Sequence, residues 1–459
     1  IKWPNDILSE NKKISGILIE NTITLKKIHN SVIGVGLNVN QTVFNKLPCA
    51  TSLKKLLGKE INVDQVLNEL INKDVTLKSI RNVSYLDLLG REEVQLDVNA
   101  IQNFIKGKRI LISGAGGSIG SELVRQCLEY DPGSLILLDN SEQNLFNIEQ
   151  EISFVNSKTL IRSVLANVRD KNLLQNTFQE YRPQVVIHAA AYKHVPMQEL
   201  HPWAAVSTNV LGTLHLVELS NQFNAEKFVL VSTDKAVHPV NIMGATKRLS
   251  EKIIQSVNLN ETKTEFLAVR FGNVIGSSGS VIPIFREQID RGGPVTITHP
   301  EMSRYFMSIT EASQLILQAG SMKGESGQIY LLDMGKPVRI KDMANDLIRL
   351  SGLEPEKDIP IIFSGLRPGE KLYEELVSRE EKAQNTDHKK IMVLNNGTNN
   401  MPWSLMQREI QSLVDISLKF DTDQIKRKLQ QLIPDYTPQD FYALGKDLNL
   451  DVTSIKGEA

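Results

Sequence analysis

The sequence predicts an α/β protein that is built on a parallel, doubly wound sheet with a smaller lobe, preceded by a small α+β segment. Three observations carry this prediction. An apolar strand, a glycine-rich turn and the start of a helix follow one another in residues 109–127. From residue 108 onward, apolar strand-like runs alternate with helical patterns, as a parallel sheet with crossover helices requires. Some of these runs end in small or polar residues, and ligands bind at such strand ends in open parallel sheets.

The glycine turn has the spacing of a dinucleotide-binding loop in its short-chain dehydrogenase form. Gly114, Gly117 and Gly120 follow the apolar strand at intervals of three residues. The missing Cβ atoms let the chain turn, let the backbone approach a pyrophosphate, and let the helix pack closely on the strand. The helix N-terminus, with Ser118 and Ile119 beside it, offers N–H groups and a positive dipole to the phosphates. This context predicts a Rossmann-type nucleotide site.

The ends of the following strands supply further cofactor candidates. Asp139 closes the apolar run 135–138, about twenty residues after the turn, where an acid holds the adenosine ribose hydroxyls. A carboxylate there repels a 2′-phosphate, which favours NAD over NADP. Extended short-chain enzymes place an Asp at the position of Asn167, against the adenine amino group, and an amide oxygen can accept the same hydrogen bond. The predicted NAD contacts are Gly114, Gly117, Ser118, Ile119, Gly120, Asp139, Asn167, Val168, Ala189, Ala190 and Lys247.

The composition is that of an ordinary globular protein and argues against several functions. The net charge is -1, so no global basic field points to nucleic acid. The two cysteines, Cys49 and Cys127, form no metal-ligand spacing or disulfide framework, which favours a reducing cytoplasm and no metal. We find no apolar run of about eighteen residues and no signal peptide. We expect a homo-oligomer and, since the sequence begins with Ile1, a piece of a longer protein or a trimmed reading frame.

The first seventy or so residues differ from the rest of the chain. The run Lys2-Trp3-Pro4-Asn5-Asp6 is followed by apolar runs at 13–20 and 32–40. In order and spacing these runs resemble the later half of the catalytic domain of biotin–protein ligases. In that family the lysine matching Lys2 helps to stabilise an acyl-adenylate, but the family's adenylate loop lies upstream of the matched part. We therefore expect an incomplete remnant without ligase activity.

The chain is long enough for two to four domains. The motifs predict a ligase-like fragment, a lead-in segment, an NAD-binding core, a substrate lobe interleaved with the last core elements, and a C-terminal helical extension. Their respective boundaries are 1–75, 76–107, 108–275, 276–385 and 386–459.

The residues after the strand at 228–231 carry the chemistry. Short-chain dehydrogenases place a Ser or Thr there, followed by a Tyr four residues before a Lys. The Lys holds the nicotinamide ribose and lowers the pKa of the Tyr, so that a phenolate can take a hydroxyl proton. Lys247 fits this pattern, whereas Met243 stands at the Tyr position and cannot exchange a proton. On these residues alone, an inactive enzyme is one interpretation.

A second interpretation comes from the run Thr233-Asp234-Lys235, which resembles the catalytic trio of nucleotide-sugar 4,6-dehydratases. Residues 81–438 resemble the polysaccharide-biosynthesis group of UDP-N-acetylglucosamine 4,6-dehydratases, which are extended short-chain dehydrogenases/reductases. Long members of this group carry Met where Met243 lies, and membrane helices precede their catalytic part. Here the ligase-like segment stands in place of those helices. Further matching runs lie at 87–91, 193–196, 296–307 and 367–371.

The resemblance implies a mechanism and residue roles. C4 of the sugar is oxidised with NAD, water is eliminated across C5 and C6, and the hydride returns to C6. Asp234 would protonate the leaving C6 hydroxyl, Lys235 would remove the C5 proton, and Thr233 would hydrogen-bond the 4-hydroxyl. Lys235 must be neutral for this, and we expect burial, Lys247 and the cofactor to lower its pKa. Water, Lys235 or Asp234 remain candidates for taking the 4-hydroxyl proton, and the Met-bearing type favours retention at C5.

Cationic and amide side chains outside this trio are candidates for binding the UDP-sugar, because a diphosphate suits bidentate arginine. Two rival functions stay open: a UDP-sugar 4-epimerase, which needs no elimination acid and base, and a non-catalytic fusion of ligase-like and NAD-binding parts. The intact trio argues against both. The candidate substrate contacts are Lys193, His194, Asn273, Arg304 and Arg367.

Overall fold

The computed structural model divides the chain into two compact units, Ile1–Arg91 and Glu92–Ala459. Lys2, its neighbours in the run 1–5, and the run 87–91 lie outside the described residues. The structure describes residues 6–9, 12–24, 27–44, 50–64, 66, 94–155, 158–257, 262–277, 279–378, 380–395 and 401–438.

The first unit contains a three-stranded antiparallel sheet in the order β1-β2-β3. A short helix, α1 (Leu53–Leu57), follows it. Ser52 caps this helix by accepting a hydrogen bond from the backbone N–H of Lys55, and Gly58 ends it with a φ of 68°, which favours glycine. The strands are β1 (Asp6–Ser9), β2 (Lys12–Thr24) and β3 (Lys27–Leu37).

The second unit is organised around a nine-stranded sheet, in the order β17-β18-β14-β9-β8-β7-β4-β5-β6. The seven strands from β14 to β6 pair in parallel, and β18 and β17 continue the sheet antiparallel. The strands are β4 (Arg109–Ser113), β5 (Ser134–Asp139), β6 (Leu160–Leu165), β7 (Val185–His188), β8 (Lys227–Val231), β9 (Glu265–Arg270), β14 (Gln328–Leu332), β17 (Lys382–Asn385) and β18 (Ile391–Asn395).

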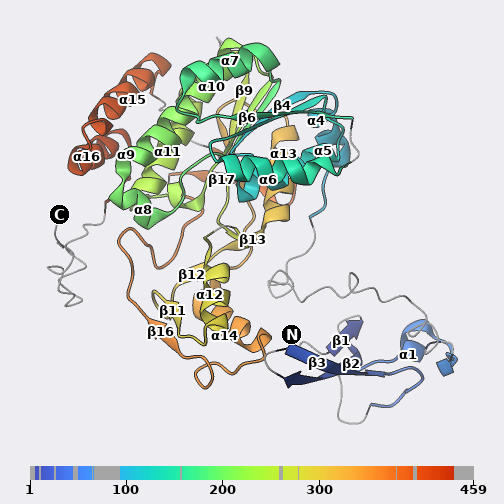
Figure 1. Cartoon of the computed structure of the whole chain (residues 1–459). Coiled ribbons are helices and arrows are strands. Elements are labelled where there is room, and N and C mark those ends of the chain that lie inside the picture. Colours follow the sequence, from blue (N-terminus) through green and yellow to red (C-terminus); the bar gives the residue numbers. More distant parts are fainter. Residues whose placement is uncertain are drawn as a thin grey trace. The chain divides into compact units, whose positions relative to one another are not determined.

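Helices cover both faces of this sheet (Figure 1). One hydrophobic core takes in side chains from α4 (Val98–Ile105), α5 (Ser118–Leu128), α6 (Glu142–Ser153) and α13 (Ile309–Ser321). The other takes in α7 (Lys171–Tyr181), α9 (Pro202–Ala205), the π-helix η1 (Val206–Leu211), α10 (Gly212–Gln222), α11 (Ile242–Ser256), α15 (Trp403–Ser417) and α16 (Thr422–Leu432).

The alternation of side chains along β4 explains the two cores. Ile110 and Ile112 belong to one core and Leu111 belongs to the other, and all three are 0% exposed. Successive side chains of a strand point to opposite faces, so a strand that is apolar throughout must be covered on both. The predicted fold class, a Rossmann-type doubly wound sheet, is confirmed.

A smaller lobe lies beyond the carboxyl ends of the strands, built from three two-stranded pairs and two helices (Figure 1). Its strands pair as β10 (Asn273–Ile275) with β13 (Phe306–Ser308), β11 (Val295–Ile297) with β16 (Ile361–Phe363), and β12 (Ser303–Arg304) with β15 (Val338–Arg339). Its helices are α12 (Val281–Asp290) and α14 (Ile340–Leu350). Two further short elements are α8 (Val195–Leu200) and the 3-10 turn η2 (Asp234–Ala236).

The C-terminal part differs in one respect from the helical extension predicted for 386–459. Two helices form where the sequence indicates them, at α15 and α16, but β18 first joins the core sheet. The edge strand β17 (Lys382–Asn385) is exposed throughout and gives no apolar signal, but the apolar run at the start of β18 is a strand signal that the prediction overlooked.

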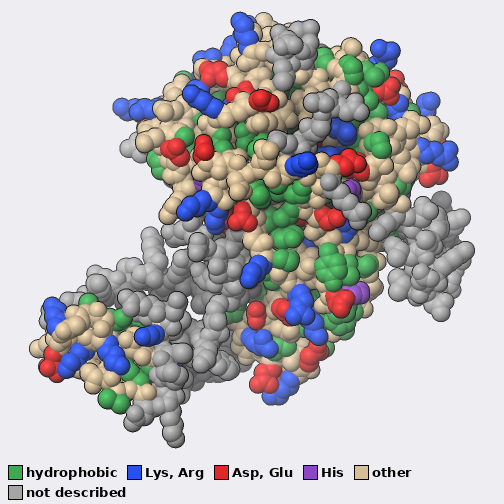
Figure 2. All heavy atoms as spheres, turned by 180° about the vertical axis from the view of Figure 1, so that it is seen from behind, with side chains coloured by type: hydrophobic (Ala, Val, Ile, Leu, Met, Phe, Trp, Pro, Cys, Tyr) green, Lys and Arg blue, Asp and Glu red, His purple; other side chains and the backbone are tan. Residues whose placement is uncertain are grey.

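The surface carries both signs of charge. In Figure 2, Lys and Arg side chains are interspersed with Asp and Glu over the face shown. This agrees with the net charge of -1. Among the residues that the structure describes, no helix has both the length and the apolarity needed to cross a bilayer.

Candidate functional site

A cavity of about 540 Å³ opens at the carboxyl ends of the parallel strands. The chain order of the strands reverses between β4 and β7, and ligands bind at this switch point in open α/β sheets. The lining includes the glycine turn, the loop after β7, the loop after β8, one face of α11, and β10 with the Gly/Ser-rich turn that follows it. The tertiary structure therefore brings two predicted groups of residues, the cofactor turn and the catalytic run, to one cavity.

The glycine turn leaves no space for side chains. Gly114 has a φ of 72°, and a Cβ there would lie 2.7 Å from the backbone nitrogen of Ala190. A Cβ on Gly120 would lie 1.9 Å from the carbonyl oxygen of Gly114, and one on Gly117 would lie 3.2 Å from the same oxygen. Gly117 is also the N-cap of α5. The turn, the helix start and the small residues Ala189 and Ala190 thus fit the pyrophosphate of a dinucleotide.

The acid at the end of β5 lies where the sequence places it. Asp139 is buried, and its two carboxylate oxygens accept backbone hydrogen bonds from Gly116 at 2.9 Å and Ser141 at 2.9 Å. Each oxygen keeps a second lone pair that could accept from a ribose hydroxyl. Asp139 therefore shapes the glycine turn; it lies outside the residues that line the cavity, and its contact with the ribose stays a prediction.

Asn167 and Val168 lie outside the residues that line the cavity. The Asn167 side-chain oxygen already accepts hydrogen bonds from the backbone N–H and the Nε of Arg169, at 3.0 and 3.1 Å. Val168 is buried, and a Cβ on Gly212 would lie 2.5 Å from its Cγ2. An adenine contact by Asn167 stays a prediction, and it would share an oxygen that Arg169 already uses.

The catalytic run follows β8 directly and bends into the cavity through η2. Asp234 is 0% exposed, and its Oδ1 accepts hydrogen bonds from the Thr233 hydroxyl at 2.9 Å and the Lys235 Nζ at 3.1 Å. The Lys235 Nζ also donates to the Asn273 side-chain oxygen at 2.9 Å. A carboxyl group and an amine from adjacent residues are thus joined by a hydrogen bond beside the cavity, and either group can give or take a proton.

The pKa of Lys235 differs from the expectation. Burial lowers it, but the negative charges of Asp234 and Glu374 outweigh burial, and the net effect raises the pKa above its ordinary value. The predicted lowering of this pKa is therefore wrong, because the sequence does not show how close the carboxylates lie. In this state Lys235 is an ammonium group paired with Asp234.

Met243 and Lys247 lie one turn apart on α11 and both line the cavity. Met243 is buried and presents a thioether where short-chain dehydrogenases carry a phenol. The Lys247 Nζ donates to the backbone oxygen of Val231 at 2.7 Å. Burial lowers the pKa of Lys247 to about 8. Lys247 therefore loses its charge much nearer to neutral pH than an ordinary lysine does.

The predicted substrate contacts divide into two groups. Lys193, His194 and Asn273 line the cavity, and a Cβ on Gly279 would lie 2.6 Å from the His194 ring. Arg367 is exposed and lies outside that lining. The structure therefore brings the first three together with the catalytic run and leaves Arg367 apart from them.

Arg304 is also outside the lining, and its guanidinium contacts the backbone. Its Nη1 donates to the carbonyl oxygens of Ser303 and Leu372 at 2.7 and 3.1 Å, and its Nη2 donates to that of Lys371 at 2.8 Å. Its Nε lies 3.8 Å from the Glu374 Oε1. Arg304 fixes the segment that returns from the lobe to the core, and these contacts use three of the five donors that it could offer to a diphosphate.

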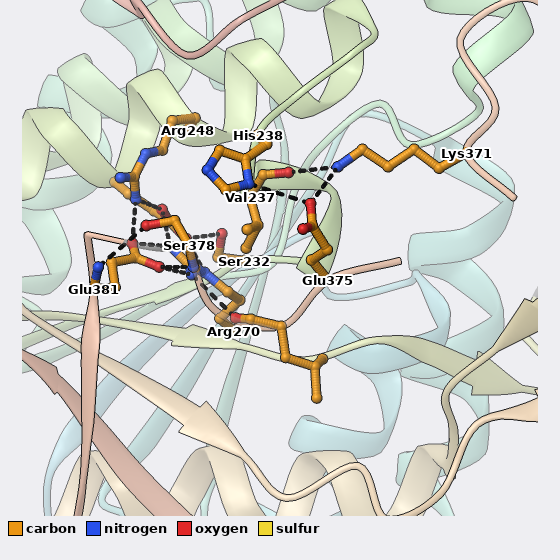
Figure 3. Close-up of polar contacts among 11 residues, drawn as sticks. Ser232, Val237, His238, Arg248, Arg270, Lys371, Glu375, Ser378 and Glu381 are labelled. Carbon is orange, nitrogen blue, oxygen red and sulfur yellow. Dashed lines mark hydrogen bonds and ion pairs between the residues drawn. The ribbon is translucent and has the colours of Figure 1, made fainter. Parts of the chain in front are cut away.

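This returning segment, residues 369–378, 380 and 381, is here called the strap. Several contacts fasten it to the loop after β8 and to α11. Asn241 donates to the carbonyl oxygen of Gly369 at 2.8 Å, and the Lys371 Nζ donates to that of Val237 at 2.9 Å. Lys371 and His238 both meet the Glu375 carboxylate (Figure 3). The strap is therefore bonded directly to the residues that follow the catalytic run.

A buried ion-pair network holds the end of the strap against the core (Figure 3). Arg270 on β9 is 0% exposed and donates to both oxygens of Glu251 at 3.1 and 2.8 Å, and to both oxygens of Glu381 at 2.8 and 3.0 Å. Arg248 donates to the same two carboxylates. The Ser232 hydroxyl donates to Glu251 at 2.7 Å, so the network reaches the residue before the catalytic run.

The network predicts a loss of stability in acid. Burial raises the pKa of Glu381, but hydrogen bonds and charge from Arg270 outweigh it and lower the pKa to about 2 from an ordinary 4.5. A carboxylate with a lowered folded-state pKa stabilises the fold above its unfolded pKa and loses that contribution as pH falls through the folded value. We expect Glu381→Gln to destabilise the protein at pH 6 and progressively less from about pH 4.5 downward, measured by urea unfolding.

The control is Glu354→Gln, because Glu354 pairs with Lys357 on the surface and is 67% exposed. An exposed pair contributes little, so this variant should follow the wild-type pH dependence. Equal destabilisation by Glu381→Gln at pH 6 and pH 3 would contradict the prediction.

Several residues of the site escaped sequence reasoning. Gly116 is confined as tightly as the fingerprint glycines, since a Cβ there would lie 2.5 Å from the Cβ of Asn144. Glu374 reaches Lys235 from the strap. A glycine inside the fingerprint could have been noticed, but no spacing in the sequence connects Glu374 with Lys235.

Two family profiles match the sequence. Residues 110–396 match a family described as polysaccharide biosynthesis protein, and residues 1–38 match the biotin/lipoate A/B protein ligase family. The capsular polysaccharide biosynthesis protein CapD of Staphylococcus aureus is 44% identical over 376 residues, covering 82% of this chain and 62% of that protein. The chain thus spans less than two thirds of that relative.

Two enzymes and one solved structure are also similar. A UDP-glucose 4-epimerase of Rickettsia bellii is 36% identical over 61% of this chain and 80% of its own. A UDP-N-acetylglucosamine 4,6-dehydratase (inverting) of Campylobacter jejuni is 33% identical over 60% of this chain and 79% of its own. The X-ray structure of Pen from Bacillus thuringiensis has a TM-score of 0.59 at 30% identity, covering 65% of this chain and 89% of that one.

Proposed function

Because the chain belongs to the polysaccharide biosynthesis protein family, we propose that it is an NAD-dependent nucleotide-sugar 4,6-dehydratase that acts on UDP-N-acetylglucosamine. The products would be water and the UDP-4-keto-6-deoxy sugar with retained C5 configuration, used for surface polysaccharide. One observation carries the proposal. The Lys235 Nζ lies 3.1 Å from the Asp234 Oδ1, beside a cavity whose lining includes the glycine turn.

This hydrogen bond already contains the protons that an elimination needs. An ammonium paired with a carboxylate holds as many protons as an amine paired with a carboxylic acid. Transfer of one proton from Lys235 to Asp234 therefore gives a base for the C5 proton and an acid for the leaving C6 hydroxyl. An epimerase has no step that requires such a pair, which favours dehydration over the epimerase activity named for the Rickettsia relative.

The other residues would orient the sugar and the cofactor. NAD, when bound, supplies the oxidant for C4 and returns the hydride to C6, so the overall reaction is redox-neutral. The glycine turn would hold its pyrophosphate and Lys247 its nicotinamide ribose. Thr233 would hydrogen-bond the 4-hydroxyl, and Lys193, His194 and Asn273, which line the same cavity, would contact the UDP-sugar.

The test is proton NMR of UDP-N-acetylglucosamine incubated with the chain and NAD in heavy water. We expect a new C6 methyl signal, deuterium at C5, and a coupling pattern for retained configuration. UDP-N-acetylgalactosamine without a methyl signal would instead establish epimerisation. Unchanged substrate would contradict turnover of this sugar and favour a non-catalytic NAD-binding fusion.

The glycine turn gives a graded prediction for NAD binding. Gly120→Ala should raise the Kd for NAD at least tenfold and lower thermal stability, because its Cβ would lie 1.9 Å from the Gly114 carbonyl oxygen. Gly117→Ala, whose Cβ would lie 3.2 Å from that oxygen, is the matched control and should lose less affinity. Isothermal titration calorimetry measures both. Equal losses would contradict the predicted dependence on this close packing.

A further inference from the structure

Glu374 on the strap brings a third carboxylate to the catalytic run. Its side chain is 4% exposed, and its Oε1 lies 3.8 Å from both the Lys235 Nζ and the Arg304 Nε. Its Oε2 is buried and has no hydrogen-bond partner among the residues that the structure describes. Burial of a carboxylate with one oxygen unpaired is costly, so the position calls for an explanation.

The Lys235 ammonium lies among charges from three separate segments. Asp234 on η2 lies in the same hydrogen bond, Glu374 approaches from the strap, and Arg304 approaches from β12. The remaining close partner, Asn273 on β10, is uncharged. The two carboxylates favour the ammonium form and the guanidinium opposes it.

To become the acid, Asp234 must take the proton that Lys235 holds in this arrangement. Its Oδ2 is also buried without a hydrogen-bond partner in the described part of the chain. When the proton moves from Lys235 to Asp234, Asp234 loses its charge and Lys235 loses its own. Glu374 is then the one carboxylate left close to Lys235, and its charge resists the transfer by favouring the ammonium.

We propose that Glu374 is a positioning residue for the elimination step, which holds Lys235 between the strap and Asp234 and governs how readily Lys235 gives up its proton. This inference rests on the proposed dehydratase function. It gives the strap a task beyond fastening the loop after β8, because Glu374 places a negative charge beside the base.

The test is the pH dependence of kcat for formation of the C6 methyl product. The transfer from Lys235 to Asp234 needs the proton that this pair shares, so the rate should fall at high pH as Lys235 loses that proton to solvent. Glu374→Gln removes a negative charge near that ammonium. We expect the midpoint of this falling limb to move about 1–3 pH units lower. A merely structural role would lower the rate at every pH without moving this midpoint.

Two variants accompany it. Glu374→Asp keeps the charge but withdraws it by one methylene, so its midpoint should fall between those of the wild type and Glu374→Gln. Glu375→Gln is the matched control. Glu375 lies on the same strap and is 51% exposed, with contacts to His238 and Lys371. Its removal should leave the midpoint unchanged, because it disturbs the strap without changing a charge beside Lys235.

The outcomes separate this inference from the function on which it rests. A wild-type chain that forms no methyl product overturns both. A wild-type chain that dehydrates the sugar, with the same midpoint in Glu374→Gln, overturns the role of Glu374 alone. An equal shift in Glu375→Gln also overturns it. Should Glu374→Gln fail to fold, an unshifted midpoint in Glu374→Asp decides against the proposal.

Discussion

Asp234→Asn should lower kcat for the C6 methyl product by about 10²–10⁴-fold and leave NAD affinity unchanged. Asp234 is 0% exposed and shares a hydrogen bond with Lys235 at 3.1 Å. An amide of nearly the same shape fills its place, but it cannot accept the proton from Lys235 and pass it to a leaving hydroxyl. The block should fall on the elimination step. The product is measured by proton NMR and NAD affinity by calorimetry.

The matched control is Asp170→Asn. Asp170 is exposed and caps α7 by accepting a hydrogen bond from the backbone N–H of Leu173 at 3.0 Å. Asn caps helices as well as Asp does, so this variant should keep wild-type activity. Thermal unfolding of both variants checks the fold. A rate within tenfold of wild type in a folded Asp234→Asn would exclude Asp234 as the acid.

Arg270→Met should cost about 3–5 kcal/mol in the free energy of unfolding. The guanidinium is fully buried and supplies four hydrogen bonds to Glu251 and Glu381. Removal of one partner from a buried ion-pair network leaves buried charges without compensation. In this network the two carboxylates would retain only Arg248 as a cationic partner. The measurement is equilibrium unfolding in urea. We also expect lower dehydratase activity, because Ser232 and the strap both contact the network.

Arg339→Met provides the comparison for this loss of a guanidinium. Arg339 pairs with Asp342 at 3.1 Å on the surface and is 68% exposed. A surface change of this kind usually stays within about 0.5 kcal/mol. Similar unfolding free energies for the two variants would show that the Arg270 network contributes little to stability.

Much of the core could be predicted from the sequence because its signals are local. The strand, the three glycines and the helix start lie within a few residues of one another, and backbone sterics act at that range. The position of Thr233, Asp234 and Lys235 at the cavity follows from one rule of topology. Parallel strands place their carboxyl ends at one edge of the sheet, so a polar run after β8 must meet the turn after β4.

The charge of the site could not be predicted in the same way. Glu374, Arg304 and Lys235 come from three segments far apart in the chain, and the structure places both cationic nitrogens 3.8 Å from the Glu374 Oε1. Arg304 carries the charge expected for a diphosphate ligand but turns its donors to carbonyl oxygens of the strap and of Ser303. Neither the contacts of Glu374 nor those of Arg304 can be recognised from the spacing of residues in the sequence.

The sequence alone therefore determined the doubly wound fold, the nucleotide turn and the membership of Asp234 and Lys235 in the site, since these follow from local sterics and strand topology. Only the tertiary structure decided that Lys235 is an ammonium group, that Arg304 fixes the strap, and that Glu374 joins the catalytic run. The reason is that coulombic interactions depend on distance in space and on burial, and both are set by packing between segments that lie far apart in the chain.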